Sequence, residues 1–591
     1  MSDFQDNPEA FYASKPWLKE YGPGVPTEFQ PLSDRNMPEL IRRCAQKYGD
    51  KTAFTICLDS GMNASLTYGE TDRYSDELAA YLRYELGLGK GDRVAVQMPN
   101  CLAYPVSAFG TLKAGCVLVN VNPLYTAREM NHQLKDSGAR VLIIIDMFAD
   151  KLEKALAGTQ VEKVLLVGIN AFFPAMKRAL VSFVLKRVRK LIPRTTVAAT
   201  RLAAALAAGR RHVGTLRSDP PGLAPGDTAV LQYTGGTTGV AKGAELTHDN
   251  LLSNISQIYA TAGPILHEGK ETVLTALPLY HIFAFTFNLM IFYVAGGRNI
   301  LCPSPRPPSN LRKPFEQFRV TKFSAVNILF AGLLQEPWFR DSPPTSIDLS
   351  VAGGTALHRS VAEQWQQLVG SKIAEGYGLS ETSPVVTLNP PQGEIRVGTI
   401  GVPAPGTDVR IVDERGNLLP PGRPGELQVQ GPQVMHGYWH RPDETDKVLK
   451  DGWFSTGDMA VIDERGYITI VDRKKDMIDV SGFNVYPNEV EETLSAHPKI
   501  AEAAVVGVPQ PEGGEKVRAY VVSRDGNLTE DDVIRFARES LTAYKVPKEV
   551  VFRDDLPKTP VGKILRKDLR QETETQASGQ QTDTRPAGSA K

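Results

Sequence analysis

Cysteine is scarce in this chain of 591 residues, which contains only Cys44, Cys57, Cys101, Cys116 and Cys302. The five are scattered, form no Cys-x-x-Cys pair and have no histidine at metal-ligand spacing. A disulfide framework and a zinc site are therefore not expected, and the pattern favours a reducing cytoplasm. A secretory signal is not expected either, because the N-terminal stretch carries acidic side chains and no apolar core.

Net charge is also lacking, because 67 Lys and Arg residues balance 67 Asp and Glu residues. The chain has no overall basic bias, so a nucleic-acid partner is not expected. Apolar residues make up 42% and charged residues 23% of the chain, as in an ordinary globular protein. At roughly 150 residues per domain, the length predicts about three or four domains.

Charged residues are missing from residues 273–297, a run long enough to cross a bilayer. The run is interrupted by Pro278, His281 and Asn288, and it ends at Gly296-Gly297. These breaks favour a buried wall of a large apolar pocket over a transmembrane helix.

Acidic residues are missing from residues 170–218, where Leu180, Val181 and Phe183 interleave with the first of many basic residues. A basic amphipathic helix is typical of a membrane-surface element. The alternative is a solvated helical insertion whose apolar side packs on the body of the protein. The basic residues are Lys177, Arg178, Lys186, Arg187, Arg189, Lys190, Arg194, Arg201, Arg210, Arg211 and Arg217.

Strand-like apolar runs alternate with amphipathic helical stretches over roughly the first 470 residues. Residues 93–97, 140–145 and 164–167 are typical of buried strands, and residues 68–86 repeat apolar positions at helical spacing. The alternation predicts the α/β fold class, with helices covering mixed or parallel sheets, in a large domain of residues 1–472.

A compact α+β pattern follows and predicts a small C-terminal domain at residues 473–570. A helix is expected at 487–496, followed by two strand-like runs. A second helix is expected to begin at Thr529, whose Thr-x-x-Asp pattern is typical of a helix cap, and a strand at 549–552. Residues 571–591 are polar and without periodicity, which predicts a disordered tail.

Residues 233–243 are rich in glycine and threonine and carry the strongest local signal for chemistry. The glycines let the backbone bring N–H groups near an anion, the threonine hydroxyls add donors, and the lysine adds a positive charge. This suits a triphosphate, although Gly243 after the lysine distinguishes the segment from a Walker A loop. The alternative is a turn between a strand and a helix. The candidate ATP-binding residues are Thr234, Gly235, Gly236, Thr237, Thr238, Gly239 and Lys242.

This segment resembles the phosphate-binding loop of the adenylate-forming superfamily, which includes acyl-CoA synthetases, peptide-synthetase adenylation domains and beetle luciferases. Further segments resemble that family's motifs in the same order, so the resemblance extends from Lys113 to Lys563. Residues 451–478 are most similar to the signature of fatty acyl-CoA synthetases, and TGGTTGVAKGAELTH resembles bacterial long-chain fatty acid:CoA ligases. The further segments are PLYH (278–281), AGGT (352–355), EGYGLSET (375–382), STGD (455–458), DRKK (472–475) and KTPVGK (558–563).

The resemblance implies a large N-terminal domain of adenylate-forming type and a small mobile C-terminal domain. It implies activation of a long-chain fatty acid by ATP through an acyl-adenylate, with release of pyrophosphate and AMP and transfer of the acyl group to coenzyme A. ATP, Mg²⁺ and CoA are the cofactors and co-substrates expected. The expected location is the cytoplasm. Contact of residues 170–218 with the cytoplasmic face of the inner membrane and a homodimer are hypotheses that the sequence leaves open.

In the nucleotide site that the resemblance implies, Tyr377 stacks on the adenine. Asp458 accepts hydrogen bonds from the ribose hydroxyls, which suits a carboxylate facing two donors. Arg473 bridges ribose and phosphate. The glycines that leave room for the base are Gly353, Gly354 and Gly376, with Gly378 in the same motif.

The resemblance also assigns a set of residues to the phosphates of ATP. Glu381 is expected to hold Mg²⁺ against them, because oxygen ligands suit this hard cation and one or two carboxylates often suffice. Thr237 is the other candidate metal ligand. Either Ser380 or Thr382 is expected to donate a hydrogen bond to phosphate.

The resemblance also assigns the two reaction steps. Lys563 is expected to offset the charge that develops when the carboxylate attacks the α-phosphorus. The small domain then turns about Lys475, which withdraws Lys563 and brings Gly482 to the pantetheine channel, where a residue without Cβ permits close approach. His281 is a gate beside the carboxylate, an orienting donor or a packed histidine.

Alternatives of other classes stay open at this point. The acyl acceptor could be a carrier protein, or the substrate a medium-chain acid, because residues 281–294 and 327–334 could line an acyl tunnel or form ordinary core. A luciferase-like oxygenase and a non-enzymatic membrane-surface protein built around residues 170–218 are further readings. The series of motifs argues against the last.

Overall fold

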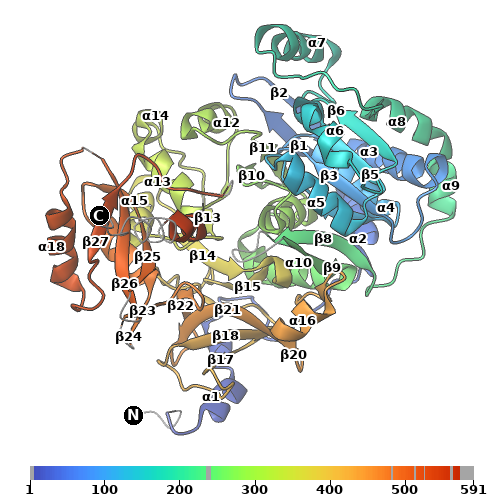
Figure 1. Cartoon of the computed structure of the whole chain (residues 1–591). Helices are drawn as coiled ribbons and strands as arrows, with labels where there is room; N and C mark the ends of the chain where they lie inside the picture. The colour runs from blue at the N-terminus through green and yellow to red at the C-terminus, as the bar shows by residue number, and fades with distance from the viewer. Residues whose placement is uncertain are drawn as a thin grey trace, which may run out of the picture.

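The computed structural model describes residues 5–234, 241–480, 483–510, 514–524, 526–559 and 563–572 (Figure 1). Five of the predicted phosphate-loop residues, Gly235, Gly236, Thr237, Thr238 and Gly239, lie outside the described residues. Gly482 and nearly all of the predicted tail lie outside them as well.

An eight-stranded sheet forms one half of the large domain, in the order β19-β9-β8-β4-β3-β5-β6-β7. Its central strands are parallel, and β8 and β9 pair antiparallel. The buried strands expected from apolar runs are confirmed as β3, β5 and β6. The strands are β3 (Arg93–Gln97), β4 (Val117–Asn120), β5 (Val141–Ile145), β6 (Lys163–Val167), β7 (Thr200–Arg201), β8 (Thr228–Thr234), β9 (Lys242–Thr247) and β19 (Gly437–Tyr438).

A nine-stranded sheet forms the other half, in the order β16-β15-β14-β13-β12-β10-β11-β1-β2, and the α/β fold class is confirmed. Strands β1 and β10 to β14 run parallel, and the edges are antiparallel. The strands are β1 (Thr52–Cys57), β2 (Asn63–Thr67), β10 (Thr272–Thr275), β11 (Arg298–Leu301), β12 (Lys322–Ala325), β13 (Leu349–Ala352), β14 (Ile373–Gly378), β15 (Val385–Leu388) and β16 (Val402–Pro403).

Helices cover these sheets, and the helix expected at 68–86 is confirmed. Helix α3 (Tyr68–Ala80) begins with a capping box between Thr67 and Glu70 and continues into the π-helical turn η2 (Tyr81–Glu85). Its inner face packs on α4 (Ala103–Lys113), whose residues are all buried.

The run without charged residues is a buried part of the large domain, as expected. It comprises β10, the PLYH turn, the helical segments η7 (Ala284–Ile291) and α11 (Phe292–Val294), and all the residues of both segments are buried. No helix among the described residues is long and apolar enough to cross a membrane. That this wall belongs to a large pocket stays a prediction.

A five-stranded antiparallel sheet lies below these halves in Figure 1 and leads into the small unit. Its strands are β17 (Asp408–Val412), β18 (Gly425–Gln430), β20 (Leu449–Lys450), β21 (Trp453–Ile462) and β22 (Ile468–Arg473).

The small C-terminal unit has its own apolar core, in which Val490, Val505 and Val533 are buried. The Thr529–Asp532 capping box is confirmed at the start of α18. The elements are β23 (Ile478–Val480), β24 (Phe483–Val485), α17 (Pro487–Ser495), β25 (Ile500–Pro509), β26 (Glu515–Ser523), α18 (Glu530–Ser540) and β27 (Glu549–Phe552).

The basic stretch consists of two unequal parts. Its second part, α8 (Leu202–Gly209), η5 (Arg210–His212) and α9 (Val213–Ser218), is tied to the body by ion pairs. These pairs are Arg210–Glu77 and Arg217–Asp76, both at 2.8 Å, and Arg201 of β7, just before α8, pairs with Asp146 at 3.0 Å. The first part, α7 (Ala175–Phe183) and η4 (Val184–Val188), lies at the outer edge of the molecule (Figure 1).

All five cysteines are free and buried. Burial raises the pKa of Cys57 to about 11 and the pKa of each of the other four to about 12. Their thiols therefore stay protonated at neutral pH.

Candidate active site

The candidate site residues lie where strands of the two large sheets end. Thr234 ends β8, Ala352 ends β13 and Gly378 ends β14, and in open α/β sheets ligands bind at such carboxyl ends. Thr234 stands opposite Lys242 in the β8–β9 register. The glycine-rich segment therefore joins two antiparallel strands and not a strand and a helix, and its role in binding phosphate stays a prediction.

Lys242 is held by side chains that the sequence patterns did not single out. Its ammonium pairs with Glu444 in α16 (Pro442–Val448) and lies 4.9 Å from the centre of the Tyr438 ring. The hydrogen bond from Lys242 lowers the pKa of Glu444 to about 2. A nucleotide phosphate would have to compete with this carboxylate for the lysine.

Glu381 lies in the short helix η9 (Ser380–Thr382), and Tyr438 also contacts it. The phenol of Tyr438 donates to Glu381 Oε1 at 2.7 Å, and burial raises the pKa of this carboxyl group. Among the described residues no ion pair neutralises Glu381. A buried oxygen ligand without a cationic partner fits a divalent cation such as Mg²⁺.

Ser380 and Thr382, the two candidate donors of a hydrogen bond to phosphate, have different surroundings. The Thr382 hydroxyl is fully buried, lies within hydrogen-bond distance of the carbonyl oxygens of Leu379 and Pro384, to one of which it can donate, and accepts a hydrogen bond from Leu379 N. It holds the turn, so Ser380, which is partly exposed, is the better candidate donor.

The proposed adenine and ribose residues lie together beside the C-terminal end of β14. The Tyr377 hydroxyl donates to Asp458 Oδ2 at 2.5 Å, and Arg473 Nε lies 2.7 Å from Asp458 Oδ1. Asp458 and Arg473 are direct partners in the β21–β22 register, which explains why they meet. The sequence predicts that these three residues share one site, but it does not predict the hydrogen bond and the ion pair between them.

The glycines leave little room for any other residue. A Cβ at Gly378 would lie 1.8 Å from Pro384 O, and Gly354 has a φ of +81°, which disfavours other residues. A Cβ at Gly353 would meet Phe283 and the carbonyl of Gly376, so these two strand ends pack directly together.

His281 is the last residue of the PLYH turn and is partly buried. Burial lowers the pKa of His281 to about 4, so the ring is neutral at pH 7. Its Nδ1 accepts a hydrogen bond from Phe283 N at 3.4 Å, which leaves Nε2–H as a donor. The turn before it is held by buried Asn100, which bonds Thr275 O, Leu277 O and Leu279 N at 2.8–3.0 Å.

Lys563 of the small unit reaches this region. Burial, and next the positive charge of Arg473, lower the pKa of Lys563 to about 8, while Asp458 opposes the shift. Its backbone is fixed by Thr559, which donates to Lys563 O at 2.7 Å. Lys475 lies in the connection between the units, and burial lowers its pKa.

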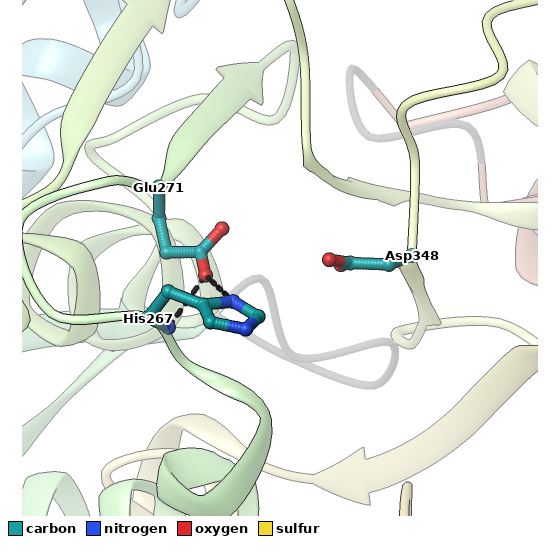
Figure 2. Close-up of side chains that lie close together, drawn as sticks. All are labelled: His267, Glu271 and Asp348. Atoms are coloured by element: carbon teal, nitrogen blue, oxygen red, sulfur yellow. Dashed lines mark hydrogen bonds and ion pairs between the residues drawn. The ribbon is translucent and has the colours of Figure 1, made fainter.

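A cluster of His267, Glu271 and Asp348 lies elsewhere, with ligand atoms within 4.8 Å of one another (Figure 2). Lys322 Nζ lies 2.9 Å from Glu271 and also pairs with Asp348. Because an ammonium already occupies the position between the carboxylates, we interpret the cluster as an ion-pair network.

Comparisons with known proteins identify the family of the chain. The family model for AMP-binding enzymes matches residues 41–439, and that for the AMP-binding enzyme C-terminal domain matches residues 489–563. A long-chain-fatty-acid–CoA ligase of Escherichia coli O6:H1 is 48% identical over 94% of this chain and 98% of that protein. A long-chain-fatty-acid–CoA ligase of Bacillus subtilis is 38% identical over 95% and 98%.

Solved structures show the same fold. ATP-bound MatB from Rhodopseudomonas palustris is 30% identical, with a TM-score of 0.76 over 91% of this chain and 99% of that chain. The anthranilate CoA ligase AuaEII, in complex with anthranoyl-AMP, has a TM-score of 0.78 at 24% identity, over 94% of this chain and 99% of that chain. This chain therefore belongs to the AMP-binding enzyme family, within the group of the long-chain-fatty-acid–CoA ligases.

Proposed function

We propose that the protein activates a long-chain fatty acid with ATP to an acyl-adenylate and transfers the acyl group to CoA, releasing pyrophosphate and AMP. The observation that carries the proposal is the cluster of Tyr377, Asp458 and Arg473 beside the end of β14, with Lys563 buried near enough that the charges of Arg473 and Asp458 act on it. The names of the relatives support the fatty-acid substrate and CoA.

In the first step the fatty carboxylate attacks the α-phosphorus and pyrophosphate leaves. Lys563 places a cation where two anions approach, and Arg473 adds a second. Tyr377 and Asp458 would exchange their mutual hydrogen bond for contacts with adenine and ribose. Neutral His281 would orient the carboxylate through Nε2–H.

The residues assigned to Mg²⁺ are Glu381 and Thr237, of which only Glu381 is described. The ion would supply positive charge beside the phosphates. Lys242 and Ser380 would hold the phosphate oxygens once Lys242 exchanges Glu444 for them.

In the second step the CoA thiol attacks the acyl-adenylate carbonyl and AMP leaves. We assign residues 473–570 as a lid that turns about Lys475 between the steps, with Gly482 lining the approach of pantetheine.

The reaction is tested by measuring pyrophosphate release with fatty acids of increasing length, with and without CoA. Release should require the fatty acid and rise with chain length, and a thioester should form only with CoA. Preference for medium chains, or transfer only to a carrier protein, would select the corresponding alternative. Release without added fatty acid would refute the proposal.

The assignment of Lys563 is tested by separating the half-reactions. Lys563→Ala should slow adenylation by roughly 10²–10³-fold, as the loss of one electrostatic stabiliser does, while acyl-CoA still forms from supplied acyl-adenylate. Equal losses in both half-reactions would contradict the assignment.

Peripheral contact with an anionic membrane is a second proposal, favoured by the exposed side chains of α7 and η4. Met176 is 88%, Leu180 53%, Phe183 59% and Val188 63% exposed. Among the described residues the basic side chains of α7 and η4 make no ion pair, and Arg189, just after η4, pairs with Asp59 at 3.8 Å. Apolar side chains flanked by unpaired cations suit a surface of anionic lipid.

Sedimentation with vesicles of mixed phosphatidylcholine and phosphatidylglycerol tests the membrane proposal. Leu180→Ser with Phe183→Ser should lower the partition coefficient at least about tenfold, because apolar area no longer enters the lipid. Leu124→Ser is the matched control, since Leu124 is 60% exposed outside this part. Unchanged binding by the double variant would exclude the surface. The homodimer stays a prediction that light scattering can test.

A further inference from the structure

A short connection, residues 474–477, joins strand β22 of the large domain to β23 of the small unit. Asp472 lies just before it and is paired with Met459 in the β21–β22 register, so it belongs to the large domain. Its side chain is completely buried. A buried carboxylate at this point is costly unless partners surround it.

Two of those partners come from beyond the connection. Arg566 Nη1 lies 2.9 Å from Asp472 Oδ1, and the Asn488 backbone N–H donates to Asp472 Oδ2 at 2.7 Å. Asn488 Nδ2 also donates to Val471 O at 3.2 Å. Asn488 is in the first turn of α17, so the carboxylate of the large domain satisfies an N–H at a helix end of the small unit.

Arg566 also binds its own unit. Its Nε donates to Glu491 Oε1 at 2.9 Å, and its guanidinium contacts Asn488. Arg566 follows Lys563 by three residues, so the group that contacts Asp472 is fixed close to the lysine that reaches Arg473.

We infer that Asp472, Arg566 and Asn488 form a latch that holds the small unit in the orientation required for adenylation. Turning the unit about residues 474–477 separates Arg566 and Asn488 from Asp472. The Arg566–Glu491 pair lies wholly beyond the connection and moves as one body. The latch thus favours the orientation with Lys563 at the nucleotide site, and this inference rests on the two-step reaction proposed above.

Asp472→Asn tests the latch because it keeps the shape and removes the charge. Pyrophosphate release should slow by about 5- to 150-fold, the range of a conformational coupling, while acyl-CoA formation from supplied acyl-adenylate stays unchanged or speeds up. Arg566→Gln should behave in the same way, and Arg566→Lys should recover part of the adenylation rate. Arg553→Gln is the control, since Arg553 pairs with Glu572 and both residues lie on the C-terminal side of the connection.

Melting temperatures show whether each variant folds. If Asp472→Asn does not fold, the two Arg566 variants are used to test the latch. The latch is overturned if folded Asp472→Asn or Arg566→Gln loses both half-reactions equally or loses neither. Lys563→Ala, measured in parallel, separates this failure from that of the reaction scheme. If only Lys563→Ala slows adenylation more than thioester formation, the latch is refuted. If Lys563→Ala also slows both half-reactions equally, the two-step scheme itself is refuted.

Discussion

The pH dependence of the adenylation rate should report the protonation state of Lys563. Its pKa is lowered to about 8 by burial and by the charge of Arg473, and a lowered lysine pKa means that the neutral form appears as the pH rises through that value. The charged fraction should fall from about 0.9 at pH 7 to about 0.1 at pH 9. If the cation is required, kcat/KM for ATP should fall roughly tenfold over this interval.

The measurement is pyrophosphate release at low ATP, where kcat/KM reports the free enzyme. Lys563→Arg is the control: it is less active, but its profile should stay flat to pH 9 because an arginine does not titrate there. A lysine with its ordinary pKa would keep about 97% of its charge at pH 9. A flat wild-type profile, or the same fall in Lys563→Arg, would therefore refute the reasoning.

Three further substitutions test contacts around the site. Glu444→Gln frees Lys242 and should lower KM for ATP a few-fold in steady-state assays; a higher KM would mean that Glu444 positions the lysine. Tyr438→Phe leaves the Glu381 carboxylate buried without this donor and should lower the free energy of unfolding by about 1–3 kcal/mol in denaturant titrations, whereas a neutral change would show that water replaces the phenol. Asn100→Ala removes three hydrogen bonds to backbone groups beside the PLYH turn, and it should lower the free energy of unfolding by about 2–4 kcal/mol and raise KM for the fatty acid. An unchanged KM would show that this turn does not contact the substrate.

Local patterns in the sequence were sufficient where the signal is local. The capping box at Thr529 and the strands at 93–97 and 141–145 depend on neighbouring residues, and each was predicted close to its bounds. The family motifs predicted that Tyr377, Asp458 and Arg473 share a site, because the motifs carry those residues as a set.

Contacts between distant segments could not be predicted in this way. Tyr438 meets Glu381 across 57 residues and Lys242 meets Glu444 across 202, and no periodicity marks either partner. Acidic residues are absent from the whole basic stretch, yet Arg210 pairs with Glu77, 133 residues away in the sequence, while the basic side chains of α7 make no ion pair among the described residues. Its division into a docked and an exposed part depends on the tertiary fold alone.

The burial of all five cysteines has a chemical consequence for an enzyme that makes a mixed anhydride. An acyl-adenylate acylates any thiolate that reaches it, and thiolates, unlike thiols, are effective nucleophiles. With thiol pKa values of about 11 to 12, the protein's own sulfurs are both out of reach and protonated. The cysteines are thereby protected from acylation, and the reactive sulfur must arrive with the acceptor.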